Sequence, residues 1–475
     1  MSNRKTTIFL FLVLITLFNI VFIGSKIGII LALIQYTVVI SLFLKKKYIP
    51  AILLHFAFII TSLSVTGTSG LTEDTGLSVY NYHTLKLIGP VGFSYLISLL
   101  LFFSSFKNTR KLKHLLFTKM LRTLIAFAIM GVIIGVVGLL VDNKYSFREF
   151  VNGSVFIFIT IINGYILLNN HSDELLKKAY DLAPLLLMAL VFATFLGYFV
   201  FHVSTFYGGL DKIIQTADAV YFASILIVGF YQIKYKTLNI ISIVLLLAIY
   251  SISISGKGIF ALLGSLIFLC YFSFLHKPTK KSNRSLSHIM MIVIIIGLLA
   301  LGSYQLSESS LTLRKVGAFT SMFNGPLDQM DPSPYIRVAS LLNILNNGLS
   351  NPFFFIFGHG FGGYFTDDLH LFDIVDLTLG GYGQEIVDTG CFPYAHDTYA
   401  DVPLKNGLLG LIILMSIVVK YLKRVDKNYL SYTAFVWLGL VFYFNTLLAT
   451  AGVFMLYASE YRPGLDDSRD ITIDR

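Results

Sequence analysis

Long apolar runs follow one another along most of this chain, and they restrict its fold more than any other feature. An α-helix crosses the hydrocarbon core of a bilayer with about 17–25 mostly apolar residues. Runs of roughly that length lie near residues 7–23, 27–44, 48–66, 87–105, 120–141, 151–168, 182–203, 218–233, 237–255, 259–275, 288–305, 404–421 and 429–446, with a shorter one near 447–460. We therefore predict an all-α, polytopic integral membrane protein with about 13–14 transmembrane helices.

The composition agrees with lipid as the solvent for these helices. Charged residues make up 13% of the chain and the mean hydropathy is +0.76, whereas a soluble domain typically carries about 25% charged residues. The first run, 7–23, has the length of a signal peptide, but it lacks a convincing small-residue cleavage site and another apolar run follows at once. We interpret it as a retained first helix.

The basic residues are distributed unevenly about the predicted spans. The net charge of +10 raises the question of a nucleic-acid partner, but the basic residues fall mostly in short loops. With the N-terminus in the cytoplasm, 23 of the 36 Lys and Arg residues lie in inner loops or at inner helix ends, and 10 lie outside. This follows the positive-inside rule. We expect a cytoplasmic N-terminus and no nucleic-acid partner.

One long polar segment, residues 306–403, interrupts the apolar pattern. It carries 11 acidic and 3 basic residues, and the orientation above makes it extracytoplasmic. A connection of this length usually has a function. We therefore divide the chain into helices at 1–305, a large loop with site residues at 306–403, and C-terminal helices with a tail at 404–475. Within the loop, the apolar spacing predicts a helix over 335–345.

Two basic residues are candidates for binding an anion. Arg337 stands in "SPYIRVASLLNI", and its planar fork of donors matches phosphate oxygens. The alternative is an ordinary surface ion pair. Lys257 stands between two apolar runs with Gly256 and Gly258 beside it, which allows close approach of an anionic headgroup. The alternative is a lysine in a simple turn that extends toward the interface.

The stretch "PYAHDTYADVPLKNGLLGLI" places His396 beside Asp397, shortly before an apolar helix. An imidazole titrates near neutrality and suits a general base, but a structural histidine at a helix start is an equal alternative. The nearby "FGHGFGGYF" lacks the strand–glycine–helix unit of a nucleotide loop. We interpret it as a tight turn that forms a wall of the site.

We expect neither a metal nor another cofactor. His359, His370 and His396 show no metal-ligand spacing, so the sequence gives little support for a metal centre. Cys270 lies in an apolar run and Cys391 in the polar segment, so we expect no internal disulfide.

Taken in order, these pieces resemble the O-antigen polymerase and O-antigen ligase superfamily (the Wzy and WaaL proteins). "SISGKG", "RVASLLNILNN", "NPFFFIFGHGFGGYF" and "AHDTYADVPLKNGLLGLI" resemble the family's Ser-Arg-Gly element, its Arg helix, its glycine turn and its His-Asn motif with following glycines. The similarity covers about residues 255–412. It implies a helical, GT-C-like fold that works without metal or nucleotide.

The resemblance also implies a substrate and a role for individual residues. Family members act on undecaprenyl-diphosphate-linked oligosaccharides at the periplasmic face of the bacterial inner membrane, with membrane lipid and a chain-length regulator membrane protein as further partners. Arg337 would bind the diphosphate and stabilise the charge of the leaving group. His396 would deprotonate or orient the acceptor hydroxyl.

Two positions depart from the family pattern. Lys257 stands where the family has an arginine, and a lysine provides a point charge in place of a fork. Asp397 stands where the family has an asparagine. A carboxylate there would either raise the pKa of His396 or bind a sugar hydroxyl itself, and the sequence leaves both open.

The leading hypothesis is a polymerase that joins lipid-linked repeat units. An O-antigen ligase, which transfers glycan to lipid A core, is the alternative within the family, and the larger number of predicted spans favours the polymerase. A transporter or flippase would place ionisable residues or broken helices inside its spans, whereas these spans carry almost no charge. A purely structural membrane scaffold is a third alternative. The candidate rings for stacking on sugars, each with core packing as its alternative, are Tyr335, Tyr364, Tyr382 and Tyr394.

Overall fold

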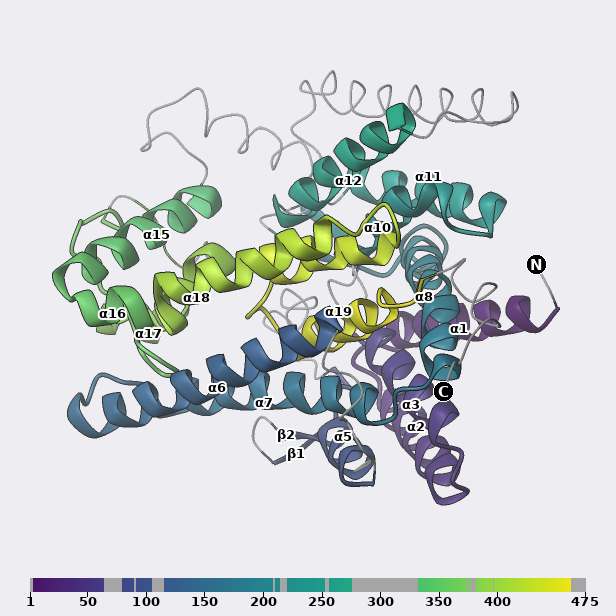
Figure 1. Cartoon of the computed structure of the whole chain (residues 1–475), viewed down its shortest axis with the longest axis horizontal. Helices are drawn as coiled ribbons and strands as arrows, with labels where there is room; N and C mark the ends of the chain where they lie inside the picture. The colour runs from purple at the N-terminus through teal and green to yellow at the C-terminus, as the bar shows by residue number, and fades with distance from the viewer. Residues whose placement is uncertain are drawn as a thin grey trace, which may run out of the picture.

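The chain is mostly helical, with the helices arranged as in Figure 1. The computed structural model describes residues 3–63, 79–88, 91–104, 115–207, 210–213, 220–252, 256–275, 332–373, 375, 377, 382–395 and 397–462. Within these residues, six helices are long and apolar enough to cross a membrane: α1 (Asn3–Val21), α2 (Ile27–Leu44), α6 (Leu116–Val141), α7 (Phe147–Asn169), α8 (Asp173–Phe199) and α18 (Thr398–Leu422). The prediction of a mostly helical chain with several membrane-length helices is confirmed at this level.

The other apolar runs form the remaining helical elements. Five are single helices: α3 (Tyr48–Ile60), α5 (Phe93–Phe103), α11 (Lys236–Ile252), α12 (Gly256–Leu275) and α19 (Thr446–Ala458). Two further runs form short apolar helices with irregular hydrogen bonding. The first, Tyr221–Tyr231, is made of α9 (Val220–Ala223), α10 (Ile225–Val228) and η4 (Gly229–Tyr231), and the second, Tyr429–Leu440, of η7 (Tyr429–Tyr432) and η8 (Phe435–Leu440). The expected span at 288–305 lies outside the described residues.

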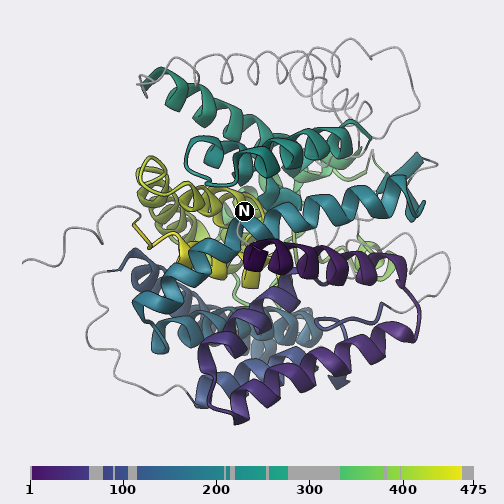
Figure 2. The same ribbon diagram turned by 90° about the vertical axis from the view of Figure 1, so that its right-hand side faces the viewer.

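Two short antiparallel hairpins interrupt the helical pattern. β1 (Lys86–Ile88) pairs with β2 (Val91–Gly92), and β3 (Ser204–Tyr207) pairs with β4 (Leu210–Ile213). Helices α1–α3 lie on one side of the molecule and α11–α12 on the opposite side, with α8 and the C-terminal helices between them (Figures 1 and 2).

The last apolar run is a core helix. Every residue of α19 from Leu447 to Ala458 is buried, where the helix packs against α3, α7 and α8. A helix that is apolar on all sides is stable only when other elements surround it. Helix α19, with 13 residues, therefore lies at the centre of the bundle.

The described part of the polar segment forms a group of helices at one end of the molecule (Figure 1). It contains α15 (Pro332–Ser350), α16 (Pro352–Phe357) and α17 (Gln384–Thr389). The helix predicted over 335–345 is confirmed as part of α15. The boundary expected at 403/404 falls inside a helix, because α18 begins at Thr398 directly after Asp397, whose backbone is extended (φ −131°, ψ 145°). The motif that carries Asp397 is therefore the start of a membrane-length helix.

The glycine turn of "FGHGFGGYF" closes a break in α18. Gly407 has φ 68° and ψ 179°, a backbone conformation that is accessible almost only to glycine, and it interrupts the helix. The break leaves the carbonyl groups before it without N–H donors from the same helix, and the glycine turn supplies these donors. The N–H of His359 donates to the carbonyl oxygen of Leu404 at 2.7 Å, and that of Gly360 to Lys405 at 3.2 Å.

The same turn inserts between α6 and α7. The N–H of Phe361 donates to the carbonyl oxygen of Gly131 at 2.9 Å, and Ser146 donates to Gly362 at 3.0 Å. The ring of Phe361 fills space that side chains at Gly131 and Gly153 would otherwise occupy. The turn therefore contacts three membrane-length helices, α6, α7 and α18.

Gly407→Ala is expected to destabilise the protein by at least about 1–3 kcal/mol, the cost of forcing a side chain into this backbone region. The added Cβ would also lie 2.0 Å from the carbonyl oxygen of Ile356. Gly383→Ala is the matched control, because nothing lies within 4 Å of a Cβ there. Thermal unfolding of the purified variants measures the difference. Equal melting temperatures would mean that α18 is not broken at Gly407.

Candidate functional site

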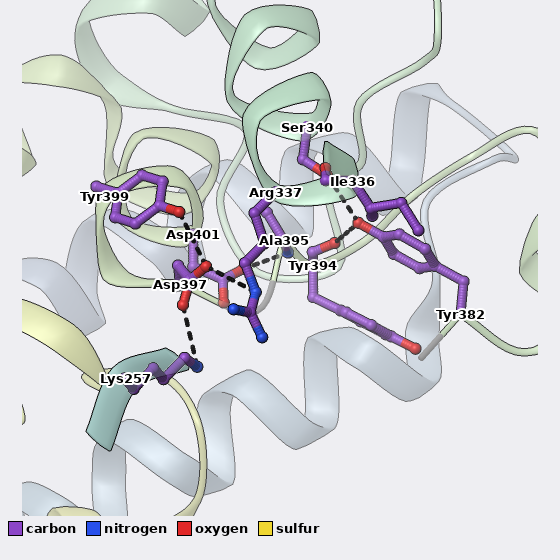
Figure 3. Close-up of polar contacts among 10 residues, drawn as sticks. All are labelled: Lys257, Ile336, Arg337, Ser340, Tyr382, Tyr394, Ala395, Asp397, Tyr399 and Asp401. Carbon is purple, nitrogen blue, oxygen red and sulfur yellow. Dashed lines mark hydrogen bonds and ion pairs between the residues drawn. The ribbon is translucent and has the colours of Figure 1, made fainter. Parts of the chain in front are cut away.

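Two cations converge on one carboxylate at the start of α18 (Figure 3). The Nζ of Lys257, from the first turn of α12, lies 3.2 Å from Oδ1 of Asp397. The Nε of Arg337, from α15, lies 3.2 Å from Oδ2 of the same carboxylate. Three segments that are distant in the sequence therefore meet at Asp397.

Burial makes this cluster electrostatically strong. Lys257 is 7% exposed and Asp397 is 4% exposed, and Coulomb interactions are stronger where water is excluded. The ammonium of Lys257 also lies over the ring of Phe444, 4.2 Å from the centroid, in cation–π geometry. Arg337 is partly accessible, with 30% of its side chain exposed. The site thus combines a buried point charge with a guanidinium that solvent or a ligand can reach.

Asp397 is held as a carboxylate by its neighbours. Burial raises its pKa, but the charges of Lys257 and Arg337 outweigh burial and hold the pKa below its ordinary value. The hydroxyl of Tyr399 also donates to Oδ2 at 3.0 Å. These pairs stabilise the fold above the ordinary aspartate pKa of about 3.9, and this stabilisation is lost as the pH falls through the lower folded-state value.

A second acid–base pair lies one turn further along α18. Oδ1 of Asp401 accepts from the backbone N–H of Ala395 at 2.9 Å and lies 3.5 Å from Nζ of Lys405. Lys405 in turn lies 4.5 Å from the ring centroid of Tyr443. The sequence interpretation missed Asp401 and Lys405, although the spacing 397, 401, 405 puts all three on one helix face.

Tyr335 lies apart from the cation cluster. It stands two residues before Arg337 on α15, which turns the two side chains by about 200°. Tyr335 is 4% exposed, packs with the apolar core of the polar segment and donates its hydroxyl to the carbonyl oxygen of Leu371 at 2.7 Å. Its position supports a packing role and places it away from the carboxylate of Asp397.

Tyr382 and Tyr394 hold the segment that leads to Asp397. Their rings are stacked, with centroids 5.4 Å apart and 21° between planes. The hydroxyl of Tyr382 donates to the carbonyl oxygen of Tyr394 at 2.9 Å. Together with the bond from Ala395 to Asp401, this fixes the backbone immediately before Asp397. His396, the predicted base, lies outside the described residues.

The structure also describes His359 and the two cysteines. His359 packs against Phe354 with centroids 4.2 Å apart, and burial lowers its pKa to about 4 although the Asp142 carboxylate acts in the opposite direction. Among the residues that the structure describes, no three His, Cys, Asp or Glu side chains gather as they would around a metal ion. Cys270 and Cys391 are both free thiols, as expected from their positions.

The arrangement can bind an anion at the ends of apolar helices. Asp397 now balances part of the positive charge of Lys257 and Arg337, and a phosphate group offers the same kind of oxygen acceptors. Since Arg337 is partly exposed, an anionic ligand can reach it without a change in the core. No family model matches this chain, and no curated protein matches it.

Proposed function

We propose that the protein is a glycosyltransferase that polymerises undecaprenyl-diphosphate-linked oligosaccharide repeat units at the periplasmic face of a bacterial inner membrane. One observation carries this proposal: Lys257 and Arg337, far apart in the sequence, converge on Asp397 where α18 begins. Two cations at the end of apolar helices suit a diphosphate attached to a lipid, because the lipid occupies the bilayer while its headgroup stays at the interface.

The reaction is a group transfer at an anomeric carbon. The acceptor hydroxyl oxygen forms a bond to the anomeric carbon of the donor sugar, and the bond between that carbon and the diphosphate oxygen breaks. The bonding electrons leave with undecaprenyl diphosphate, whose growing negative charge Arg337 and Lys257 stabilise. The hydroxyl proton passes to a base, which the family resemblance assigns to His396.

The position of the charged residues supports an enzyme over a transporter. Lys257 is the second residue of α12, and Asp397 directly precedes α18. Transporters typically bind their substrates near the middle of the bilayer. Helix α18 is itself discontinuous at Gly407, so the comparison rests on the position of the charges at helix ends and not on helix continuity. A cluster at helix ends suits chemistry on a headgroup. A ligase that transfers glycan to lipid A core would use the same groups, and the experiment below separates the two.

Deletion of the gene is expected to remove the polymer while leaving one repeat unit on the lipid A core. Gel analysis of surface glycan from the deletion strain measures this, with the wild-type gene returned as the control. Loss of all attached glycan would identify a ligase, and an unchanged ladder would exclude both enzymes. Returning a His396→Ala variant, with its expression verified, tests the base. Normal polymer from that variant would remove His396 from the mechanism.

A further inference from the structure

A cleft with both polar and apolar lining is bounded by Tyr394, on the segment that leads to the cation cluster. Its volume is about 720 Å³, within the range of about 300–1,000 Å³ that holds ligands of drug size. One wall comes from the turn between α6 and α7 and the first turn of α7, the other from the start of α17 and residues 389–394. The glycine turn contributes Gly362 and Tyr364 to its floor. The cleft is therefore built from rigid elements that also hold the site.

Two aromatic rings line this cleft in fixed orientations. The hydroxyl of Tyr364 donates to Oδ2 of Asp142 at 2.8 Å. The ring of Tyr394 stacks on Tyr382 and is turned away from Lys257 in Figure 3. Both tyrosines are only partly buried, so part of each ring is accessible to a ligand. Amphipathic rings with a polar tip suit the apolar C–H face and hydroxyl edge of a sugar.

The charges of the lining indicate a neutral ligand. Lys144 and Arg148 contribute two positive charges, and Glu149 and Glu385 contribute two negative charges. A cleft for a diphosphate would carry an excess of cations, as the Asp397 cluster does. Balanced donors and acceptors instead match the hydroxyl groups of a neutral oligosaccharide.

The cleft is close to the cations because Tyr394 stands three residues before Asp397. Three peptide units separate their Cα atoms by at most about 11 Å. We propose that this cleft binds the acceptor oligosaccharide and presents one of its hydroxyls toward the Asp397 cluster. This inference rests on the proposed function, and it assigns the acceptor to a site distinct from the diphosphate site.

The cleft can be blocked without disturbing the core. Gly383 lines it, and no atom lies within 4 Å of a Cβ placed there. Gly383→Trp is therefore expected to fill the cleft and leave the fold intact. Leu349→Trp is the matched control, because Leu349 is 70% exposed on α15 and does not line the cleft. Tyr394→Ala and Tyr394→Phe test the ring, since only the second retains an aromatic face.

The probe is the free oligosaccharide released by mild acid from the lipid-linked intermediate of the deletion strain, titrated against the purified full-length protein. Gly383→Trp and Tyr394→Ala are expected to weaken its binding by about tenfold or more, whereas Leu349→Trp and Tyr394→Phe retain it. If the deletion strain has lost its polymer but Gly383→Trp binds as tightly as wild type, the cleft assignment is wrong and the proposed function stands. If deletion leaves the polymer unchanged, both are wrong.

Discussion

Arg337→Ala is expected to lower the rate of polymer formation by about 10²–10³-fold, the usual effect of removing one group that stabilises charge in a transition state. Arg337 pairs with Asp397 through Nε at 3.2 Å and keeps 30% of its side chain exposed, so a diphosphate can reach it. Arg337→Lys keeps the charge and removes the fork, and we expect it to recover only part of the rate. Incorporation of labelled lipid-linked units by the purified variants in vesicles measures both.

The matched control for Arg337 is an arginine with a similar ion pair elsewhere. Arg424, after the other end of α18, lies 3.3 Å from Oε2 of the buried Glu460. Arg424→Lys is expected to retain polymer formation, because this pair is remote from Asp397 along a helix of 25 residues. A rate for Arg337→Ala close to that of wild type would make Arg337 a structural residue. It would also contradict a diphosphate site at this cluster.

Asp397→Ala is expected to destabilise the protein by about 3–5 kcal/mol, as found when one member of a buried ion pair is removed. The change leaves the ammonium of Lys257, which is 7% exposed, without the carboxylate that compensates its charge. The double variant Lys257→Met with Asp397→Ala removes both charges and is expected to be more stable than Asp397→Ala alone. Unfolding of Asp397→Ala, of Lys257→Met, of the double variant and of wild type in detergent forms a double-mutant cycle.

An exposed pair provides the comparison for this cycle. Lys178 and Glu174 form an i,i+4 ion pair on α8, and their side chains are 44% and 61% exposed. Glu174→Ala is expected to change stability by less than about 1 kcal/mol. If Asp397→Ala were as stable as wild type, the cluster would not be paired in the folded protein. If the stability lost in the double variant equalled the sum of the losses in the two single variants, charge compensation would not be the cause of the destabilisation.

Individual residues show how far the sequence could be interpreted. The positions of Lys257 and Arg337 beside apolar segments marked both as candidates, and both reach the same carboxylate. Two roles considered for Asp397 were raising the pKa of His396 and binding a sugar, but its ion pairs with both cations were not foreseen. Tyr335 lies in an apolar core, because its helix turns it away from Arg337. Such contacts depend on how each helix is rotated about its axis and on how the helices pack together. Neither can be predicted from a short stretch of sequence.

The length and continuity of the helices also could not be predicted from the sequence alone. The apolar runs 218–233 and 429–446 have the length of spans, but the helices that they form are shorter, Tyr221–Tyr231 and Tyr429–Leu440. Gly407 breaks α18 and lies against the backbone of Ile356. Apolar composition predicts burial or contact with lipid, but continuity of a helix depends on which neighbours supply partners for its backbone.

The sequence by itself determined that this chain is helical and suited to lipid, because the apolar runs are too long and too numerous for a soluble core. It also singled out most of the residues near the site, since charges are costly beside apolar helices and stand out there. Only the tertiary structure decided that Lys257, Arg337 and Asp397 form one cluster and that a cleft bounded by Tyr394 lies near it. The physical reason is that these contacts join α12, α15 and α18, whose relative positions depend on packing across the whole bundle.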